Sequence, residues 1–140
     1  MRLKLLALLC ATVPTLAAAQ SFKAINRLDV IPLGSGNFEV IEAYGEGARG
    51  MWCAAADYAM AISPANGQRL YVQSARAPSL TRNGRKGAVF TTNRDNLSVA
   101  PSRSVTVSVE VVGQGLPLHH AIQFCRESDR DGFIIIPGQG

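Results

Sequence analysis

Apolar and polar residues alternate most regularly in Ser104–Val112, where four valines are separated by threonine, serine and glutamate. An alternation with a period of two predicts a β-strand with one face on a core and the other in solvent. Shorter segments that are rich in β-branched and aromatic residues predict further strands between turn signals. These segments are Asn37–Tyr44, Gln68–Gln73, Gly87–Thr92, His119–Cys125 and Gly132–Ile136.

One segment has the pattern of a helix. Met51–Ile62 is rich in alanine and contains neither glycine nor proline, and Pro64 follows it closely. Its apolar residues at three- and four-residue spacing are Met51, Ala55, Tyr58 and Ile62. We therefore expect an α+β fold, with one helix packed on an antiparallel sheet of about five strands. Residues 20–36 are expected to be an irregular lead-in, and residues 37–140 a single domain.

The first nineteen residues have the composition of a secretory signal peptide. Arg2 and Lys4 form a charged start, Leu5–Ala11 is a short apolar run, and Ala17–Ala19 supply small residues for cleavage before Gln20. The run is too short to span a bilayer as a helix, and no later run is long enough. We expect an exported protein, periplasmic or secreted, with no transmembrane segment in the mature chain.

Removal of the signal changes the composition. Taking 19 residues from 140 leaves 121, and taking two basic residues from 14 leaves 12 against 10 acidic residues, a formal charge of +2. The three cysteines become two, because Cys10 lies in the signal. This count excludes an iron–sulfur protein, a four-cysteine zinc site and a scaffold with several disulfides.

The two remaining cysteines are Cys53, in the predicted helix, and Cys125, at the end of a predicted strand. In an oxidising compartment such a pair is usually a disulfide. The bridge would close a loop of 72 residues (125 − 53), and chain entropy makes such a closure worth roughly 4 kcal/mol. We therefore expect Cys53–Cys125 to attach the helix to the far end of the sheet.

A competing interpretation makes Cys53 a nucleophile, because a thiolate in the first turn of a helix is stabilised by the helix dipole. A helix that carries a cysteine, followed by a sheet with histidine on a strand, resembles the papain-like core of bacterial cell-wall hydrolases. The resemblance implies Cys53 as nucleophile and His120, or His119, as base, with Gln123 or Asp129 orienting the histidine. The substrate would then be cell-wall peptide.

The segment Gly45–Gly50 matches G-x-G-x-x-G between a predicted strand and the predicted helix. No acidic residue lies about twenty positions further on to hold a ribose, and the following segments suggest antiparallel hairpins. We therefore expect a turn and no bound dinucleotide. The free amides of the helix start, together with Arg49, could still hold an anion.

Basic residues are concentrated after the second predicted strand. They are Arg76, Arg82, Arg85 and Lys86, with Arg94 nearby. Arginine binds carboxylates and phosphates through a planar fork, so this basic loop predicts an acidic partner or an anionic surface. Tyr71 and Phe90 flank the loop instead of alternating with its basic residues, which argues against nucleic acid.

The adjacent His119 and His120 would point to opposite faces of a strand, and the chain has no H-x-x-x-H pattern. We therefore expect no metal and no other cofactor. The triplet Asn96-Leu97-Ser98 fits a glycosylation acceptor.

The stretches RGMWCAAADYA (Arg49–Ala59) and SLTRNGRKGAVFT (Ser79–Thr91) resemble small exported proteins of Gram-negative bacteria, a group of unknown function. The resemblance implies a periplasmic location and does not point to any activity. The sequence as a whole favours a disulfide-stapled binding or structural module without catalysis. A secreted inhibitor that presents the basic loop to an enzyme, and the thiol hydrolase, are the alternatives.

Overall fold

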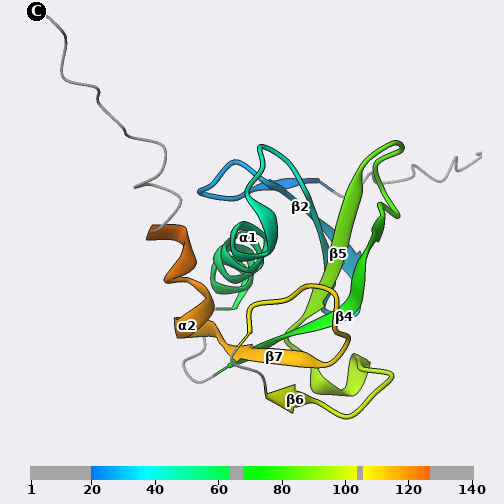
Figure 1. The fold of residues 1–140 in the computed structure, drawn as a ribbon, viewed down its shortest axis with the longest axis vertical. Coiled ribbons are helices and arrows are strands. Elements are labelled where there is room, and N and C mark those ends of the chain that lie inside the picture. The colour runs from blue at the N-terminus through cyan, green and yellow to red at the C-terminus, as the bar shows by residue number, and fades with distance from the viewer. Residues whose placement is uncertain (1–19, 64–67, 104–105, 127–140) are drawn as a thin grey trace, which may run out of the picture.

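The computed structural model describes residues 20–63, 68–103 and 106–126. Within these ranges the chain forms a seven-stranded sheet, two α-helices and one short 3-10 helix (Figure 1). The strands are β1 (Phe22–Lys23), β2 (Asp29–Gly34), β3 (Asn37–Ile41), β4 (Arg69–Pro78), β5 (Lys86–Thr91), β6 (Ser102–Arg103) and β7 (Gln114–Pro117). The helices are α1 (Gly47–Ile62), η1 (Arg94–Asn96) and α2 (Leu118–Ala121). The α+β class is confirmed, although the sheet is larger than five strands and a second α-helix is present. The expected signal peptide and the expected strand at Gly132–Ile136 lie outside the described residues.

The strands are ordered β1-β2-β3-β5-β4-β7-β6. Every neighbouring pair is antiparallel except β6 and β7, which run parallel. Because β5 is antiparallel to both β3 and β4, those two strands run in the same direction, and α1 connects them. Two register shifts occur in β4 between Val72 and Ala77. Bulges of this kind bend a strand and increase its twist, and the sheet curves around α1 (Figure 1).

The core lies between α1 and one face of the sheet. Phe38 and Phe90 from adjacent strands stack at 6.4 Å, Trp52 of α1 meets the Phe90 ring edge-on at 5.0 Å, and Tyr58 meets Phe38 at 4.7 Å. Four alanines of α1 are fully buried; these are Ala54, Ala55, Ala56 and Ala59. Small side chains let the helix approach the sheet closely, so alanine here serves packing as well as helix propensity.

The segment expected to be an irregular lead-in contains β1 and β2. Two hydrogen bonds attach its turn to α1: Asn26 Nδ2 donates to the Gly50 carbonyl at 2.8 Å, and the Ile25 amide donates to the Asp57 carboxylate at 2.8 Å. These long-range bonds hold strands whose own sequence carries little strand signal, since β2 contains Pro32 and ends at Gly34.

The prediction of a strand over Ser104–Val112 is wrong for residues 106–112, the part that the structure describes. These residues form bends beside β4, where the Val109 carbonyl accepts from the Arg76 amide at 2.9 Å. Val109 is 3% exposed whereas Val111 is 49% exposed. The alternating valines therefore do not share one buried face, and the neighbouring β7 supplies the strand instead.

The prediction of a strand over His119–Cys125 is also wrong. Leu118–Ala121 forms α2, and helical turns continue after it, with the Cys125 amide donating to the Ile122 carbonyl at 3.1 Å. Leu118, Ala121 and Cys125 are buried. Their spacing of three and four residues is a helical period, which the strand-favouring Ile122 and Phe124 obscured in the sequence.

The central elements agree better with expectation. β3, β4 and β5 overlap the predicted strands Asn37–Tyr44, Gln68–Gln73 and Gly87–Thr92, and α1 ends at Ile62 as predicted. The helix begins at Gly47, four residues before the predicted start, so it includes the end of the glycine-rich segment.

Candidate functional site

Cys53 and Cys125 form a disulfide, with their Cα atoms 4.9 Å apart. The bridge joins α1 to the turns after α2 instead of to a strand. Because α1 begins at Gly47, Cys53 lies in the second helical turn and not the first, so it lacks the position that favours a thiolate. Its side chain is fully buried. In this state the sulfur is bonded and carries no thiolate.

Both histidines of the hydrolase interpretation lie on α2. His119 and His120 are exposed on α2, and the His120 ring lies 5.7 Å from the Phe124 ring. Gln123 donates to the His119 backbone carbonyl at 3.3 Å instead of orienting an imidazole. Asp129 lies outside the described residues. Among the described residues, no hydrogen bond joins either imidazole to Cys53.

The glycine-rich segment is a tight turn into α1. Gly45 and Gly47 have φ angles of 70° and 61°, a region that side chains rarely adopt. Gly50 lies so close to Glu46 that an added Cβ would come within 2.3 Å of its side chain. The strands that flank α1 are separated by antiparallel β5, so the motif does not belong to a doubly wound parallel sheet.

Several members of the predicted basic group have structural partners or lie apart. Arg76 forms a bidentate ion pair with Glu42, with Nε and Nη2 each 2.8 Å from a carboxylate oxygen. The Arg49 guanidinium lies 5.9 Å from the centre of the Phe124 ring. Arg94 lies in η1, which follows the end of β5 that is opposite the loop. At 3.3–3.4 Å per residue β5 is about 17 Å long, so Arg94 is separated from the loop by the length of this strand. Lys86 is exposed at the start of β5.

Arg82 and Arg85 instead converge on one cavity, together with an arginine that sequence reasoning did not single out. Arg27, Arg82 and Arg85 line a cavity of about 250 Å³. Its other lining residues are Asp29, Ile41, Ala43 and Tyr44. We call this the three-arginine cavity. Arg27 and Arg82 are 55 residues apart in the chain, so no local motif signals the site.

Strand register explains the convergence. Val30 pairs with Val40, and Val40 pairs with Ala88, so β2, β3 and β5 are aligned across the sheet. The alignment of β3 with β5 continues one residue beyond β3, where the Glu42 amide donates to the Lys86 carbonyl at 2.9 Å. The turn before β2, the segment after β3 and the hairpin loop before β5 therefore meet at the same end of the sheet (Figure 1).

The arginines of the cavity keep an unbalanced positive charge. Asp29 is the one carboxylate in the lining, and Lys23 pairs with it at 2.5 Å. The nearby Glu42 carboxylate is held by Arg76, and only its backbone carbonyl accepts from Arg85 Nη2, at 2.8 Å. Within the described part of the chain, Arg27, Arg82 and Arg85 form no ion pair.

Tyr44 provides an aromatic wall. The Arg27 guanidinium lies 4.7 Å from the centre of the Tyr44 ring, and Tyr44 is 64% exposed. Arg27 and Tyr44 both have positive φ angles, 68° and 58°. Backbone strain at residues other than glycine persists where the surroundings maintain it, and it is concentrated at functional sites. Two of the three such residues in the described chain line this one cavity.

The loop that carries Arg82 and Arg85 is fixed to the sheet. Glu39 of β3 lies on the face opposite α1 and is 1% exposed. Its carboxylate accepts from the Leu80 amide at 2.8 Å and from the Thr81 hydroxyl at 2.6 Å. Within the loop, the Arg85 amide donates to the Arg82 carbonyl at 3.2 Å. The two arginines are therefore presented by a loop with its own fixed geometry.

A second cavity, of about 320 Å³, has a different electrostatic character. The Glu42–Arg76 pair lines it, together with Met51 and Glu110. Because Arg76 is paired within the wall and Glu110 adds a negative charge, this cavity offers no surplus of positive charge to an anion.

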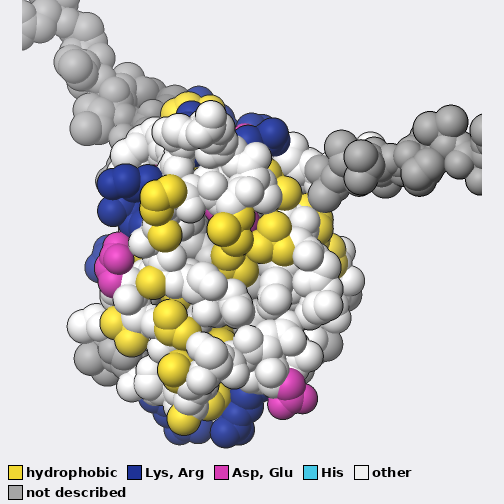
Figure 2. All heavy atoms as spheres, turned by 90° about the vertical axis from the view of Figure 1, so that its right-hand side faces the viewer, with side chains coloured by type: hydrophobic (Ala, Val, Ile, Leu, Met, Phe, Trp, Pro, Cys, Tyr) yellow, Lys and Arg dark blue, Asp and Glu magenta, His cyan; other side chains and the backbone are white. Residues whose placement is uncertain are grey.

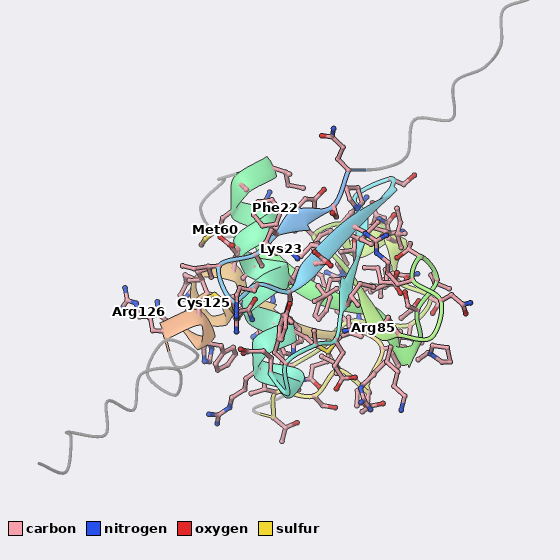
Figure 3. The ribbon with its side chains drawn as sticks, turned by 90° about the horizontal axis from the view of Figure 1, so that it is seen from above. Phe22, Lys23, Met60, Arg85, Cys125 and Arg126 are labelled. Atoms are coloured by element: carbon pink, nitrogen blue, oxygen red, sulfur yellow. A yellow bond between two sulfur atoms is a disulfide. The ribbon has the colours of Figure 1, made fainter. Side chains whose placement is uncertain are left out.

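Two further views show where basic side chains and the disulfide lie on the molecule. Figure 2 shows basic side chains near the upper and lower ends and along one side of the face that it presents, with hydrophobic side chains, several of them adjoining, between them. Figure 3 shows Arg85 and Cys125 on opposite sides of α1. The three-arginine cavity is therefore remote from the disulfide.

Among the described residues, no helix is long and apolar enough to cross a membrane. Searches of protein-family models, of curated proteins and of solved structures find no match to this chain.

Proposed function

We propose that the protein is an exported, disulfide-stapled α+β module that acts by binding, without catalysis, and that it holds an anionic group of its partner in the three-arginine cavity. The observation that carries the proposal is the convergence of Arg27, Arg82 and Arg85 on one cavity whose only carboxylate is already paired. Guanidinium groups held in fixed positions bind carboxylates and phosphates with geometric specificity.

The disulfide supports the export and the structural role of the cysteines. Bridges of this kind form and persist in oxidising compartments, and Cys53–Cys125 fastens the last described turns to the central helix. A thiol hydrolase that used Cys53 and His120 would first require reduction of this bond. Titration of free thiols in the purified protein separates the two functions, because binding with an intact staple requires none before reduction and two after it.

The binding proposal is tested with two double variants that remove equal charge. Arg82→Ala/Arg85→Ala empties one side of the cavity, whereas Arg94→Ala/Arg103→Ala removes two exposed arginines that do not line it. We expect the first variant to lose binding to a panel of citrate, glutamate-rich peptide and inorganic phosphate at constant ionic strength. The control should bind as the unaltered protein does. Equal behaviour of the two variants would show that only net charge matters.

A further inference from the structure

We propose that the group held in the three-arginine cavity is a phosphate monoester. This inference rests on the proposed function, because it names the class of anion that the cavity takes. The argument uses the number of hydrogen-bond donors, the balance of charge and the size of the cavity.

The cavity supplies more donors than a carboxylate can use. Each guanidinium has five N–H groups in a planar fork. One N–H of Arg85 is used by the Glu42 carbonyl. The Arg27 guanidinium carbon lies 4.7 Å from the centre of the Tyr44 ring, and its N–H groups form no hydrogen bond within the described residues. A carboxylate has two oxygens on a single edge, whereas a terminal phosphate presents three oxygens that several forks can share.

The charge of the three-arginine cavity also favours a phosphate monoester. The three arginines carry charges that no described carboxylate neutralises. A phosphate monoester carries about −1.5 to −2 at neutral pH, whereas a carboxylate or a phosphate diester carries one negative charge. A dianion therefore balances this cavity more fully than either.

The size and lining of the cavity indicate that it holds a terminal phosphate together with the few carbon atoms next to it. Its volume of about 250 Å³ is smaller than the roughly 300–1,000 Å³ of pockets that enclose whole small ligands. Ile41, Ala43 and the exposed Tyr44 ring form its less polar wall. We infer that the phosphate enters among the guanidinium groups and that the adjoining carbon atoms contact this wall.

Such a group occurs on soluble phosphorylated molecules and on lipid headgroups, and one experiment distinguishes these sources. The oxidised protein is titrated at constant ionic strength with glycerol phosphate, a monoester, with dimethyl phosphate, a diester, and with acetate. A parallel arm measures sedimentation with phosphatidylcholine vesicles that contain either phosphatidic acid or phosphatidylglycerol at equal charge. Binding in the first arm alone identifies a soluble ligand, and binding to phosphatidic acid vesicles identifies a lipid.

We expect glycerol phosphate or phosphatidic acid to bind at least about tenfold more tightly than its diester counterpart, the effect of one charge-assisted hydrogen bond. Arg82→Lys/Arg85→Lys keeps the charge but removes both forks, so it should lower monoester affinity by a similar factor. The control Arg94→Lys/Arg103→Lys should leave that affinity unchanged.

Four results would overturn this inference. Equal affinity for monoester and diester, or full binding by Arg82→Lys/Arg85→Lys, would reduce the cavity to a general cation site. Stronger arginine-dependent binding of acetate would leave the proposed function standing and refute the phosphate assignment. Failure of every anion in the panel to bind in an arginine-dependent way would refute both proposals.

Discussion

The loop that carries Arg82 and Arg85 depends on a buried carboxylate, and replacing that carboxylate should release the loop. Glu39 accepts one hydrogen bond from the Leu80 amide and one from the Thr81 hydroxyl. A hydrogen bond to a charged group contributes about 1.5–3 kcal/mol, against about 0.5–1.5 kcal/mol for a neutral bond. The loop donors are near solvent, so water can replace part of what is lost.

Glu39→Gln keeps the shape of the side chain and can keep both contacts as neutral bonds, because the Thr81 hydroxyl can turn to accept from the new amide group. We expect a loss of about 1–2 kcal/mol in the free energy of unfolding. Glu39→Ala removes both bonds and should cost about 2–4 kcal/mol. A double-mutant cycle with Thr81→Val should give a coupling energy of about 1.5–3 kcal/mol.

Urea unfolding with the disulfide intact measures the global effect, and limited trypsin digestion measures the local one. Trypsin cleaves after arginine and lysine, so cleavage at Arg82, Arg85 and Lys86 should accelerate when Glu39 no longer holds the loop. Glu110→Gln is the matched control, because Glu110 is exposed and the same charge is lost; it should change stability by no more than about 0.5 kcal/mol. A coupling energy below about 0.5 kcal/mol, with unchanged cleavage, would refute the anchoring role of Glu39.

Three further predictions concern the scaffold. Asn96 donates to the Ser35 carbonyl at 2.7 Å, the Asn37 side-chain oxygen at 2.8 Å and the Thr91 hydroxyl at 3.1 Å. Because Asn96→Asp replaces this donor by an anion, it should lower the free energy of unfolding in urea by about 2–4 kcal/mol. An unchanged urea midpoint would contradict this role of Asn96. Replacing both bridged cysteines by alanine opens the 72-residue loop and should cost about 2–5 kcal/mol, and equal stability of the two proteins would show that the staple is dispensable. Burial raises the pKa of Tyr58 above its ordinary value of 10.0, so the unfolded chain ionises first and stability should fall as the pH rises above about 10. Urea unfolding from about pH 9 to about pH 11 should show a shallower fall in Tyr58→Phe, and an identical slope in both proteins would remove Tyr58 as its cause.

The Asn96 contacts also bear on the glycosylation triplet. The side-chain nitrogen that would carry a glycan is hydrogen-bonded to three acceptors in the folded protein. Asn96, the first residue of the triplet, therefore has a structural role, because it holds η1 against the turn between β2 and β3. A short match in the sequence does not reveal this use, because its acceptors lie as many as 61 residues away.

Local patterns were sufficient for part of the fold. The alanine-rich period of α1 and the apolar runs of β3, β4 and β5 predict these elements, because each element contains several apolar residues close together that become buried. The two cysteines that lie outside the expected signal peptide are the pair that the structure joins. Each of these inferences needs only the order of residues and the chemistry of neighbours.

Other features were decided by contacts between distant segments. Residues 106–112 have the alternation of a strand, but they lack a partner that pairs with them continuously, and β7 takes the neighbouring position. The basic residues from Arg76 to Arg94 predict an acidic partner or an anionic surface, but which arginines share a site depends on strand register. Arg82 and Arg85 join Arg27 because β2, β3 and β5 are aligned, whereas Arg76 is paired with Glu42 and Arg94 lies beyond the other end of β5. Hydrophobic pattern determines whether a segment is buried, while side-chain convergence at a site depends on pairings that only the tertiary structure specifies.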